Sequence, residues 1–270
     1  MNIKKLLTKK EPLVIPAAFD AITTKIIEKA GFKALFVAGS SFAAAYLAKP
    51  DVYLMTLTEV LDETMKICEA VNIPVLVDVE TGYGNYLNIS RVVREYEKIG
   101  VAGILIDDRK WPSKELAVIS ETEMMEKIKT VKETRTDKNF VIVVTTYAKK
   151  VYNLEEAIRR GKQYSKAGID VIYIEGLTTS GEMSETAEAF NIPVMATMIE
   201  DGDREYLKVK QLSKMGFKVI AYPLTSLYAS VKAVIETMRE LKIYGTIRNP
   251  SKKLVSAESF NELLKAKKNR

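Results

Sequence analysis

Short apolar runs alternate with longer segments of helical periodicity through most of the 270-residue chain. The apolar runs are rich in Val and Ile and almost continuously hydrophobic, which is typical of strands that helices cover on both faces. Several helical segments end in a glycine that leads into the next run. Helices are expected after each strand, the eighth at residues 224–242. We expect the strands at residues 13–17, 34–37, 75–78, 102–106, 140–144, 171–174, 194–196 and 219–221.

Eight such units in succession close most simply into a (β/α)8 barrel, the TIM-barrel fold, which typically takes about 250 residues. No linker or low-complexity segment divides the pattern. We therefore expect one α/β barrel domain over residues 1–245 and a helical extension over residues 246–270.

Composition narrows the class of protein. Hydrophobic residues make up 47% of the chain, enough for a large core, and no apolar run reaches the ~18 residues of a membrane span. The first ten residues show no secretory signal. Cys68 is the only cysteine, so no intramolecular disulfide can form. These features favour the cytoplasm.

Charge and histidine content bear on the chemistry. The chain has 41 Lys and Arg against 35 Asp and Glu, a net charge of +6, but these charges are scattered along helical segments. No basic groove with interleaved aromatics is visible, so we expect neither nucleic acid nor a membrane as a partner. Histidine is absent, so acid–base chemistry near neutral pH must use carboxylates, Lys, Tyr, the cysteine or metal-bound water.

The stretch from Val75 to Asn85 carries the most specific pattern. An apolar run ends at Asp78 and Glu80, and the chain then enters the glycine-rich turn Thr81-Gly-Tyr-Gly-Asn85. Side chains two apart in a strand point to the same face, so the two carboxylates leave the strand end side by side. Hard divalent cations prefer such oxygen pairs. The alternative interpretation is a strand that ends in a polar turn without a ligand.

The carboxyl ends of the strands are where a barrel of this kind carries its chemistry. After the second expected strand, the backbone of Gly39, Ser40 and Ser41 offers N–H groups to a carboxylate or phosphate, and a loop leads on to Asp51. The other strand ends supply Asp78, Glu80, Asp107, Asp108, Thr145, Thr146, Glu175 and Thr197. Like charges in one cleft repel, so a cation is their natural partner, and we expect a divalent metal, Mg2+ or Mn2+.

In order and spacing, several segments resemble the isocitrate lyase and phosphoenolpyruvate mutase superfamily, from about Ile15 to Leu241. The resemblance implies a barrel in which a metal, usually Mg2+, stabilises an enolate while a C–C or C–P bond next to a 2-oxo acid breaks. The matching segments are Pro16-Ala-Ala-Phe-Asp20, Phe36-Val-Ala-Gly39, Lys49-Pro-Asp51, Leu57-Thr-Glu59 and Asp78-Val-Glu-Thr-Gly-Tyr-Gly-Asn85.

Carried over residue by residue, the resemblance implies a metal site. Asp78 would be the direct ligand, while Asp51, Glu80 and Asp107 would hold the metal through water, with Asp51 also close to the reacting atoms. Asp20 matches another acid of the family pattern, but capping of the first helix explains this residue equally well.

The resemblance also implies substrate contacts. Gly39 and Ser40, with Ser41 beside them, would donate backbone N–H groups to the substrate carboxylate and oxo group. Glu175 matches a catalytic acid that the lyases carry after the sixth strand. Tyr83, in the glycine-rich turn, would line the pocket.

The chain departs from the family pattern at the substrate end. The lyases carry Lys-Arg-Cys-Gly-His after the fourth strand, whereas this chain has Trp111-Pro-Ser-Lys114, so Cys-dependent isocitrate or methylisocitrate lysis is not expected. Thr145 replaces the fifth-strand Arg that grips the substrate carboxylate, and Thr197 replaces a seventh-strand Asn. Both threonines would contact a substrate. Arg109 and Lys114 are the nearest replacements for the lost cation, unless both are solvated loop charges.

These residues predict a Mg2+-dependent, lyase- or mutase-like enzyme for a small 2-oxo or 2-hydroxy carboxylate. C–C cleavage or decarboxylation is favoured over phosphoryl migration. Tyr147 would close the pocket or donate a proton, or else only pack. One alternative is phosphonomutase-like or phosphonopyruvate hydrolase-like C–P chemistry. Another is a non-catalytic family descendant that binds a small carboxylate or a protein partner.

The end of the chain predicts assembly. Val255, Phe260, Leu263 and Leu264 form an incomplete apolar stripe that must be buried against another surface. In the family that the chain resembles, the last helices extend from one barrel onto a neighbour. We expect a homo-oligomer, a dimer or tetramer, with a tetramer built from helix-exchanging dimers favoured and residues beyond about 245 at the interface. The alternative is a frayed basic tail over residues 265–270.

Overall fold

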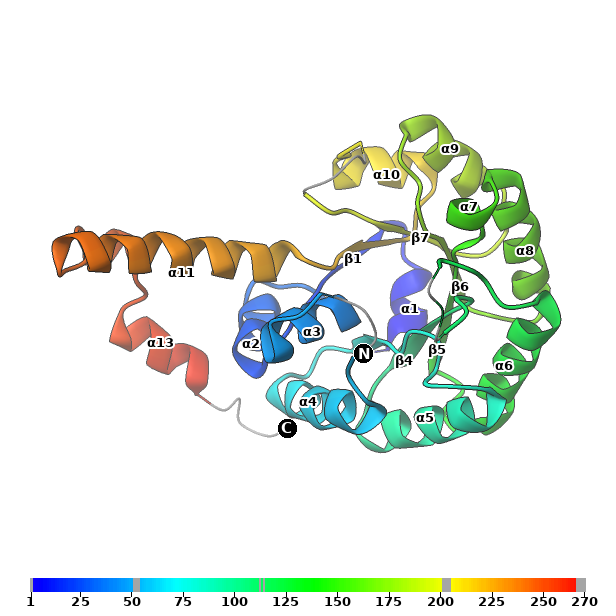
Figure 1. Cartoon of the computed structure of the whole chain (residues 1–270), viewed down its shortest axis with the longest axis horizontal. Coiled ribbons are helices and arrows are strands. Elements are labelled where there is room, and N and C mark those ends of the chain that lie inside the picture. Colours follow the sequence, from blue (N-terminus) through cyan, green and yellow to red (C-terminus); the bar gives the residue numbers. More distant parts are fainter. Residues whose placement is uncertain (1, 51–53, 112, 114, 201–204, 266–270) are drawn as a thin grey trace.

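The computed structural model describes residues 2–50, 54–111, 113, 115–200 and 205–265. Its eight parallel strands form one sheet in the order β1-β8-β7-β6-β5-β4-β3-β2. A parallel bridge between Ala17 and Phe36 joins β1 to β2, so the sheet curls into a nearly closed barrel (Figure 1). The predicted (β/α)8 barrel is confirmed. The strands are β1 (Leu13–Pro16), β2 (Leu35–Val37), β3 (Val75–Asp78), β4 (Gly103–Asp107), β5 (Val141–Thr146), β6 (Val171–Ile174), β7 (Val194–Thr197) and β8 (Val219–Tyr222).

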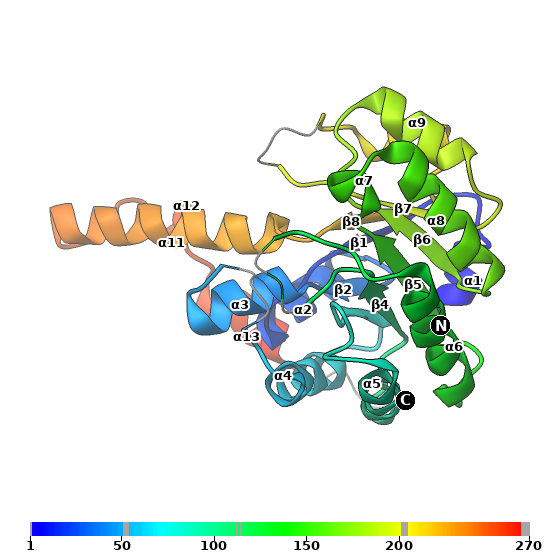
Figure 2. The ribbon, with the colours of Figure 1, turned by 45° about the vertical axis from the view of Figure 1, so that its right-hand side comes forward.

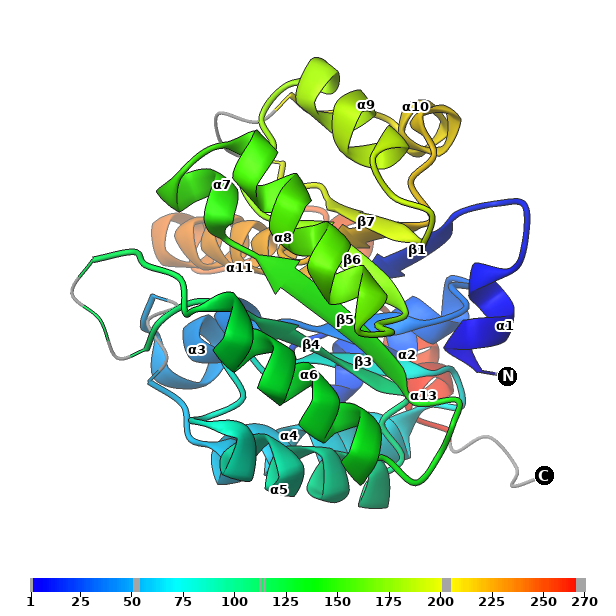
Figure 3. The same ribbon diagram turned by 90° about the vertical axis from the view of Figure 1, so that its right-hand side faces the viewer.

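Helices follow the strands around the outside of the barrel. At the opposite end from the β4–α6 connection, the short helix α1 lies near the start of the strands and contributes Ile3 and Leu6 to the barrel interior (Figure 3). The helices are α1 (Ile3–Leu7), α2 (Ala21–Lys29), α3 (Gly39–Leu47), α4 (Leu57–Ala70), α5 (Tyr86–Lys98), α6 (Glu121–Thr134), α7 (Ala148–Val151), α8 (Leu154–Lys166), α9 (Ser180–Glu188), α10 (Val209–Met215), α11 (Thr225–Tyr244), α12 (Pro250–Lys253) and α13 (Ala257–Leu264).

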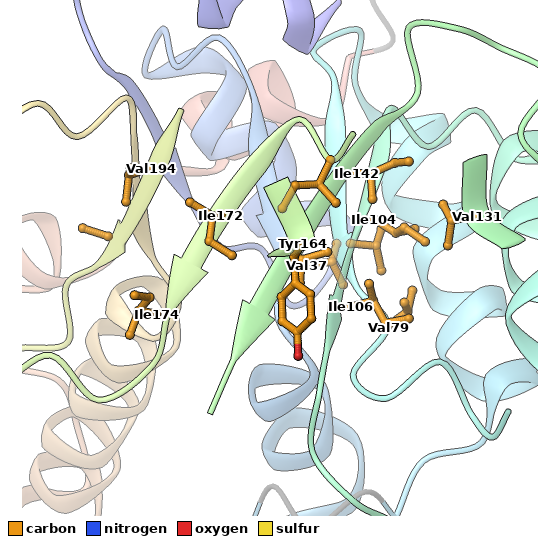
Figure 4. Packing of buried hydrophobic residues seen from close by; sticks show 14 of the residues in the cluster. Val37, Val79, Ile104, Ile106, Val131, Ile142, Tyr164, Ile172, Ile174 and Val194 are labelled. Atoms are coloured by element: carbon orange, nitrogen blue, oxygen red, sulfur yellow. The ribbon is translucent and has the colours of Figure 1, made fainter. Parts of the chain in front are cut away.

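Period-two alternation divides the strand side chains into two buried layers. Ile104, Ile142 and Ile172 belong to the outer layer, which packs against helices and includes Tyr164 of α8 (Figure 4). Their neighbours Leu105, Val143 and Tyr173 belong to the inner layer, which fills the barrel. Residues two places beyond the last inward apolar side chain therefore point into the carboxyl-end mouth.

Helix α3 corrects one expectation. We expected residues after Ser41 to form a loop towards Asp51, but they continue a helix to Leu47, and Ala48 caps it in the left-handed region at φ +49°. The sequence Phe42-Ala-Ala-Ala-Tyr46 is rich in Ala, the strongest helix former, and it overrides the expectation of a loop. Asp51 lies outside the described residues.

Helix α11 points away from the barrel instead of packing on its outer wall, and the chain then returns through α12 to α13, beside α2 (Figures 1 and 2). Glu240 of α11 holds this return segment, because its carboxylate accepts hydrogen bonds from Arg248 and Lys253. The division at residue 245 stays a prediction, but the segment that leaves the barrel begins at Thr225. Within the described residues, no helix combines the length and hydrophobicity that crossing a membrane requires.

Candidate active site

A cavity of about 240 Å³ opens where the inward-facing strand residues end. It collects residues from β2 to β8, so side chains far apart in sequence meet in one place. The polar residues that line it are Ser40, Asp78, Asp107, Arg109, Thr145, Tyr147, Tyr173, Glu175 and Thr197. We call the β2–β4 side of this cavity the acid half and the β5–β7 side the hydroxyl half.

The acid half is built around Asp78 and Asp107. Asp78 ends β3, and its Oδ1 accepts the backbone N–H of Glu80 at 2.8 Å. Asp107 ends β4 and is only 1% exposed. Burial raises the pKa of Asp107 well above its usual range, and repulsion by the Asp78 carboxylate raises this pKa further. A bound cation would relieve that repulsion.

The glycine-rich turn takes an uncommon backbone course. Glu80 and Tyr83 both have positive φ, at 53° and 58°, although neither is a glycine. This course swings the Glu80 carboxylate against Gly39, where an added Cβ would lie 2.5 Å from Glu80 Oε1. A larger residue at position 39 would therefore displace the Glu80 carboxylate, so the second and third strand ends come into direct contact there.

A buried lysine secures the same turn from behind. Lys127 of α6 is 2% exposed, and its ammonium donates a hydrogen bond to the backbone oxygen of Thr81 at 2.9 Å. Burial lowers the pKa of Lys127 below its usual range, although the nearby carboxylates of Glu123, Asp107 and Asp108 favour its charged form. Removing an ammonium group from water costs free energy. Its burial against this turn therefore indicates that the turn must be held in one conformation.

Arg109 carries the positive charge of the cavity wall. Its guanidinium donates to Asp107 Oδ2 from Nε at 2.9 Å and from Nη2 at 2.6 Å. The same group lies 4.3 Å from the centre of the Tyr147 ring. The Arg109 guanidinium is thus held by the Asp107 carboxylate and by the Tyr147 ring, and Arg109 also lines the cavity.

The hydroxyl half contains a connected chain of polar groups. The Tyr173 hydroxyl hydrogen-bonds the Glu175 carboxylate and also Thr197 Oγ1, the latter at 2.6 Å. Lys150 forms an ion pair with Glu175 at 3.0 Å. Thr145 lies beside Tyr173 in the β5–β6 register. Its Oγ1 is buried, and no hydrogen-bond partner for it is found in the described part of the chain.

Asp108 does not join the cavity, which corrects the expectation that it converges with the other acids. It follows Asp107 directly, so its side chain points to the opposite face of the sheet. There its carboxylate accepts hydrogen bonds from the Thr146 hydroxyl at 2.7 Å and the Tyr164 hydroxyl at 3.0 Å. It also accepts the Tyr147 N–H at 2.8 Å, so it supports the mouth from behind.

Most of the predicted site residues meet in or beside the cavity. Glu80 and Tyr83 instead line a neighbouring cavity, together with Trp111. Ser41 turns away, because its hydroxyl donates to the Pro223 oxygen at 2.8 Å. Asp20 caps α2 by accepting the Thr23 N–H at 2.6 Å. Asp51 and Lys114 lie outside the described residues.

Two residues that shape the site were not foreseen. Tyr173 lies two places before Glu175, so the period-two rule that paired Asp78 with Glu80 also pairs these two. That signal was present in the sequence. Lys127 gave no such signal, because one lysine among many on α6 looks solvent-exposed until the packing of the helix is known.

The donor set of the acid half fits a hard divalent cation. Asp78 and Asp107 bring carboxylate oxygens into one cavity, and Glu80 approaches from the adjoining turn. Across the described residues, no three Asp, Glu, His or Cys side chains form a direct ligand cluster by themselves. Asp78 as a single direct ligand, with water between the metal and the other acids, stays a prediction.

Fold and site together define a (β/α)8-barrel protein with an acidic, hydroxyl-lined cavity at the catalytic end of the barrel. The phosphoenolpyruvate phosphomutase family model matches residues 3–242. A 2,3-dimethylmalate lyase of Eubacterium barkeri is 36% identical over 268 residues, which cover 97% of this chain and 93% of that protein. The chain therefore belongs to the phosphoenolpyruvate phosphomutase family, within the isocitrate lyase and phosphoenolpyruvate mutase superfamily.

Solved structures give the same assignment. An oxaloacetate acetylhydrolase in complex with oxalate superposes with a TM-score of 0.91 at 25% identity, covering 97% of this chain and 92% of that one. A phosphonopyruvate hydrolase in complex with oxalate and Mg2+ gives 0.90 at 26% identity, covering 97% and 95%. The chain is accordingly a lyase- or mutase-like enzyme.

Proposed function

We propose that this enzyme is Mg2+-dependent and breaks a C–C bond of a small 2-oxo or 2-hydroxy carboxylate, by cleavage or decarboxylation. The observation that carries the proposal is the cavity itself, because two carboxylates suited to a cation, hydroxyl groups and a guanidinium suited to a substrate all line it. When bound, Mg2+ would supply Lewis-acid stabilisation of the negative charge that develops on a substrate oxygen.

The charges of the cavity favour C–C over C–P chemistry. A phosphoryl group is usually a dianion, and enzymes surround it with several cations. Three acids line this cavity, whereas among its described lining residues Arg109 is the one cation. A carboxylate needs only one guanidinium edge. The dimethylmalate lyase, a C–C lyase by name, supports the same choice.

Each half then has its own part in binding. Arg109 would hold a substrate carboxylate, because its position is fixed by Asp107 and by the Tyr147 ring. Thr145 would donate its buried hydroxyl to a substrate oxygen. Ser40, at the start of α3, would direct backbone N–H groups to the carboxylate end of the substrate.

Calorimetry tests the proposal. Oxalate has the shape and charge of a 2-oxo acid enolate, so the pure protein should bind oxalate with Mg2+ or Mn2+ at least tenfold more tightly than without metal. Turnover of oxaloacetate, dimethylmalate, methylisocitrate and phosphonopyruvate with Mg2+ then identifies the bond broken. Absence of both metal-dependent oxalate binding and turnover would instead support a non-catalytic binding protein. Turnover of phosphonopyruvate alone would support C–P chemistry.

We also propose that the chain forms a homo-oligomer, a dimer or tetramer, in which α11 packs on a second copy. Each of the other seven strands is followed by a helix on the barrel wall, whereas α11 leaves the wall after β8 (Figure 1). The apolar side chains of α11 are exposed, and the barrel wall that α11 leaves has no helix from this place in the chain to cover it. The same wall of a second copy would be a surface on which these side chains could be buried. They include Val231, Val234, Ile235, Met238 and Leu241.

Light scattering at micromolar concentration tests the assembly. We expect a mass of at least twice the 30.3 kDa of one chain. Ile235→Glu, at a side chain that is 54% exposed, should produce monomers, whereas the control Lys232→Glu on the same helix should not. A monomeric wild-type protein would refute the proposal. The cytoplasm remains the compartment that we propose, on the evidence of the single cysteine.

A further inference from the structure

The proposed reaction needs a proton donor, and the residues that most often serve are missing from the mouth. The chain has no histidine. Its one cysteine, Cys68, lines a different cavity together with Val75, the first residue of β3, at the far end of the barrel. Burial also raises the pKa of the Cys68 thiol to about 12. The proton must therefore come from a carboxyl, phenol or amine group, or from water.

Two tyrosines line the cavity, and their surroundings differ. The Tyr147 ring lies under the Arg109 guanidinium, with Lys150 Nζ 5.5 Å from its centre. Burial raises the pKa of the Tyr147 hydroxyl well above its usual range. The Tyr173 hydroxyl instead bonds directly to a carboxylate, that of Glu175, and this contact provides a path for a proton.

We propose that Tyr173 is a catalytic residue that donates the proton to carbon in the proposed reaction, and that Glu175 returns the proton to it. The inference rests on the proposed function and names a new participant in the same site. Its basis is geometric: the phenol and the carboxylate share a hydrogen bond, and both line the cavity where the substrate would bind.

The surroundings hold the phenol in place for this task. Thr197 Oγ1 lies 2.6 Å from the Tyr173 oxygen, and either hydroxyl can be the donor, so Tyr173 can keep one hydrogen bond whichever way its proton points. Lys150 fixes the Glu175 carboxylate at 3.0 Å. Of the hydroxyls here, a phenol is much more acidic than those of Thr145 and Thr197, so it is the stronger donor.

The neighbouring Thr145 gives an independent reason to place the reacting molecule here. Its hydroxyl is buried beside Tyr173 and lacks a hydrogen-bond partner among the described residues. A buried hydroxyl without a partner is costly, and a substrate oxygen would remove that cost. The substrate would then lie within reach of the Tyr173 phenol.

The step balances for a 2-hydroxy carboxylate. Glu175 accepts the proton of the substrate hydroxyl, a C=O bond forms, and the adjacent C–C bond breaks with its electron pair left on the departing carbon. Tyr173 gives its proton to that carbon and forms the new C–H bond. The proton on Glu175 then passes to the Tyr173 oxygen, so both residues end as they began and no co-reactant is consumed.

Tyr173→Phe tests the proposal, because it keeps the ring and removes the hydroxyl. We expect kcat to fall about 100- to 10,000-fold with KM changed less than threefold. Tyr164→Phe is the matched control, since Tyr164 is also buried and also donates to a carboxylate, but outside the cavity. Its kcat should stay within threefold of wild type. The assays use dimethylmalate and oxaloacetate with Mg2+ in D2O. They follow deuterium in the carbon that Tyr173 would protonate, which is C2 of the propionate formed from dimethylmalate and C3 of the pyruvate formed from oxaloacetate.

A second variant keeps the test decisive if Tyr173→Phe fails to fold. Glu175→Gln should also lower kcat at least tenfold, and the double variant should lose no more than the worse single variant, because two residues of one relay fail together. Losses that multiply would overturn the relay. If Tyr173→Phe keeps wild-type turnover and exchange, the inference fails and the proposed function stands. If the wild-type protein shows neither turnover nor exchange, both fail.

Discussion

The two halves of the cavity are built in different ways. The acid half depends on backbone geometry: Glu80 and Tyr83 take positive φ, Gly39 leaves room for a carboxylate, and Lys127 holds the turn. The hydroxyl half depends on side chains that hydrogen-bond one another, and Tyr173 is at the centre of these hydrogen bonds. Arg109 lies where the two halves meet, bonded to Asp107 and against the Tyr147 ring.

This difference suggests why the acid half keeps the family motif while the hydroxyl half departs from it. A side-chain change in the acid half disturbs a strained turn and the contact of two strand ends. In the hydroxyl half, one side chain can replace another if its partners change with it. The acid half would then supply the chemistry common to the family, and the hydroxyl half would select the substrate and deliver the proton.

Removing the central carboxylate should have the largest effect. Asp78→Ala should abolish divalent binding and lower turnover at least 1,000-fold, because Asp78 is the proposed direct ligand. The fold should survive, with a loss of about 1 kcal/mol from the missing hydrogen bond to the Glu80 N–H. Calorimetry and thermal unfolding check both parts. Asp62→Ala, at an exposed position on α4, is the control, and retained metal affinity in Asp78→Ala would refute the assignment.

A smaller effect is expected where the halves meet. Arg109→Gln should raise KM, and the Kd of oxalate with Mg2+, about 10- to 100-fold, as for loss of one charge-assisted hydrogen bond of about 1.5–3 kcal/mol. The exposed neighbour Lys110→Gln should change neither value more than twofold. Equal affinities in both variants would show that Arg109 only pairs with Asp107 and does not hold the substrate.

The barrel was predictable because its signals are local and periodic. The expected strands at 75–78 and 171–174 match β3 and β6 residue for residue, since Pro74 directly precedes the first run and Gly168 stops the helix just before the second. The expectation failed at α3, where Gly39 and two serines suggested a loop. Helix propensity of the following alanines decided the outcome there.

The site was predictable only as far as strand periodicity reaches. Asp78 and Asp107 follow apolar runs directly, so their place at the mouth could be inferred. The same rule would have placed Asp108, one residue after Asp107, on the opposite face of the sheet. It would also have placed Tyr173 on the same face as Glu175, two residues later. Arg109 could be named as a candidate cation, but its contacts with Asp107 and the Tyr147 ring depend on the course of a loop. The role of Lys127 depends on packing between elements that lie far apart in sequence, and no single-sequence pattern encodes it.

The support behind the acid half should appear in stability. Lys127→Met keeps the bulk of the side chain but leaves the Thr81 oxygen without its hydrogen bond, which should cost about 1–3 kcal/mol of unfolding free energy. Lys132→Met is the matched control, because Lys132 also lies on α6 and donates to a backbone oxygen, that of Ala167, at an exposed position. It should cost less than about 1 kcal/mol. Urea unfolding with an unchanged m value measures both, and equal losses would contradict a special role for Lys127.

The smallest expected effect concerns the support behind the hydroxyl half, and it depends on pH. Glu156 accepts hydrogen bonds from Arg159 and Arg160, and Arg160 lies 3.8 Å from Asp108, the acid that supports Tyr147. Hydrogen bonds from Arg159 lower the pKa of Glu156 from 4.5 to about 2. A carboxyl whose pKa is lower in the folded state stabilises the fold above its unfolded pKa, and that contribution disappears as pH falls through the folded value.

Glu156→Gln should therefore be less stable than wild type at pH 6, by about 1 kcal/mol or less because these charges are partly exposed and screened. As the pH falls from 4.5 towards 2, wild type loses its advantage, so the two stabilities should converge. Glu155→Gln, at the exposed neighbouring position, should match wild type throughout. Urea unfolding at pH 6, 4 and 3 measures the difference. A gap between wild type and Glu156→Gln that stays constant from pH 6 to 3 would mean that the carboxylate does not support this half through its charge.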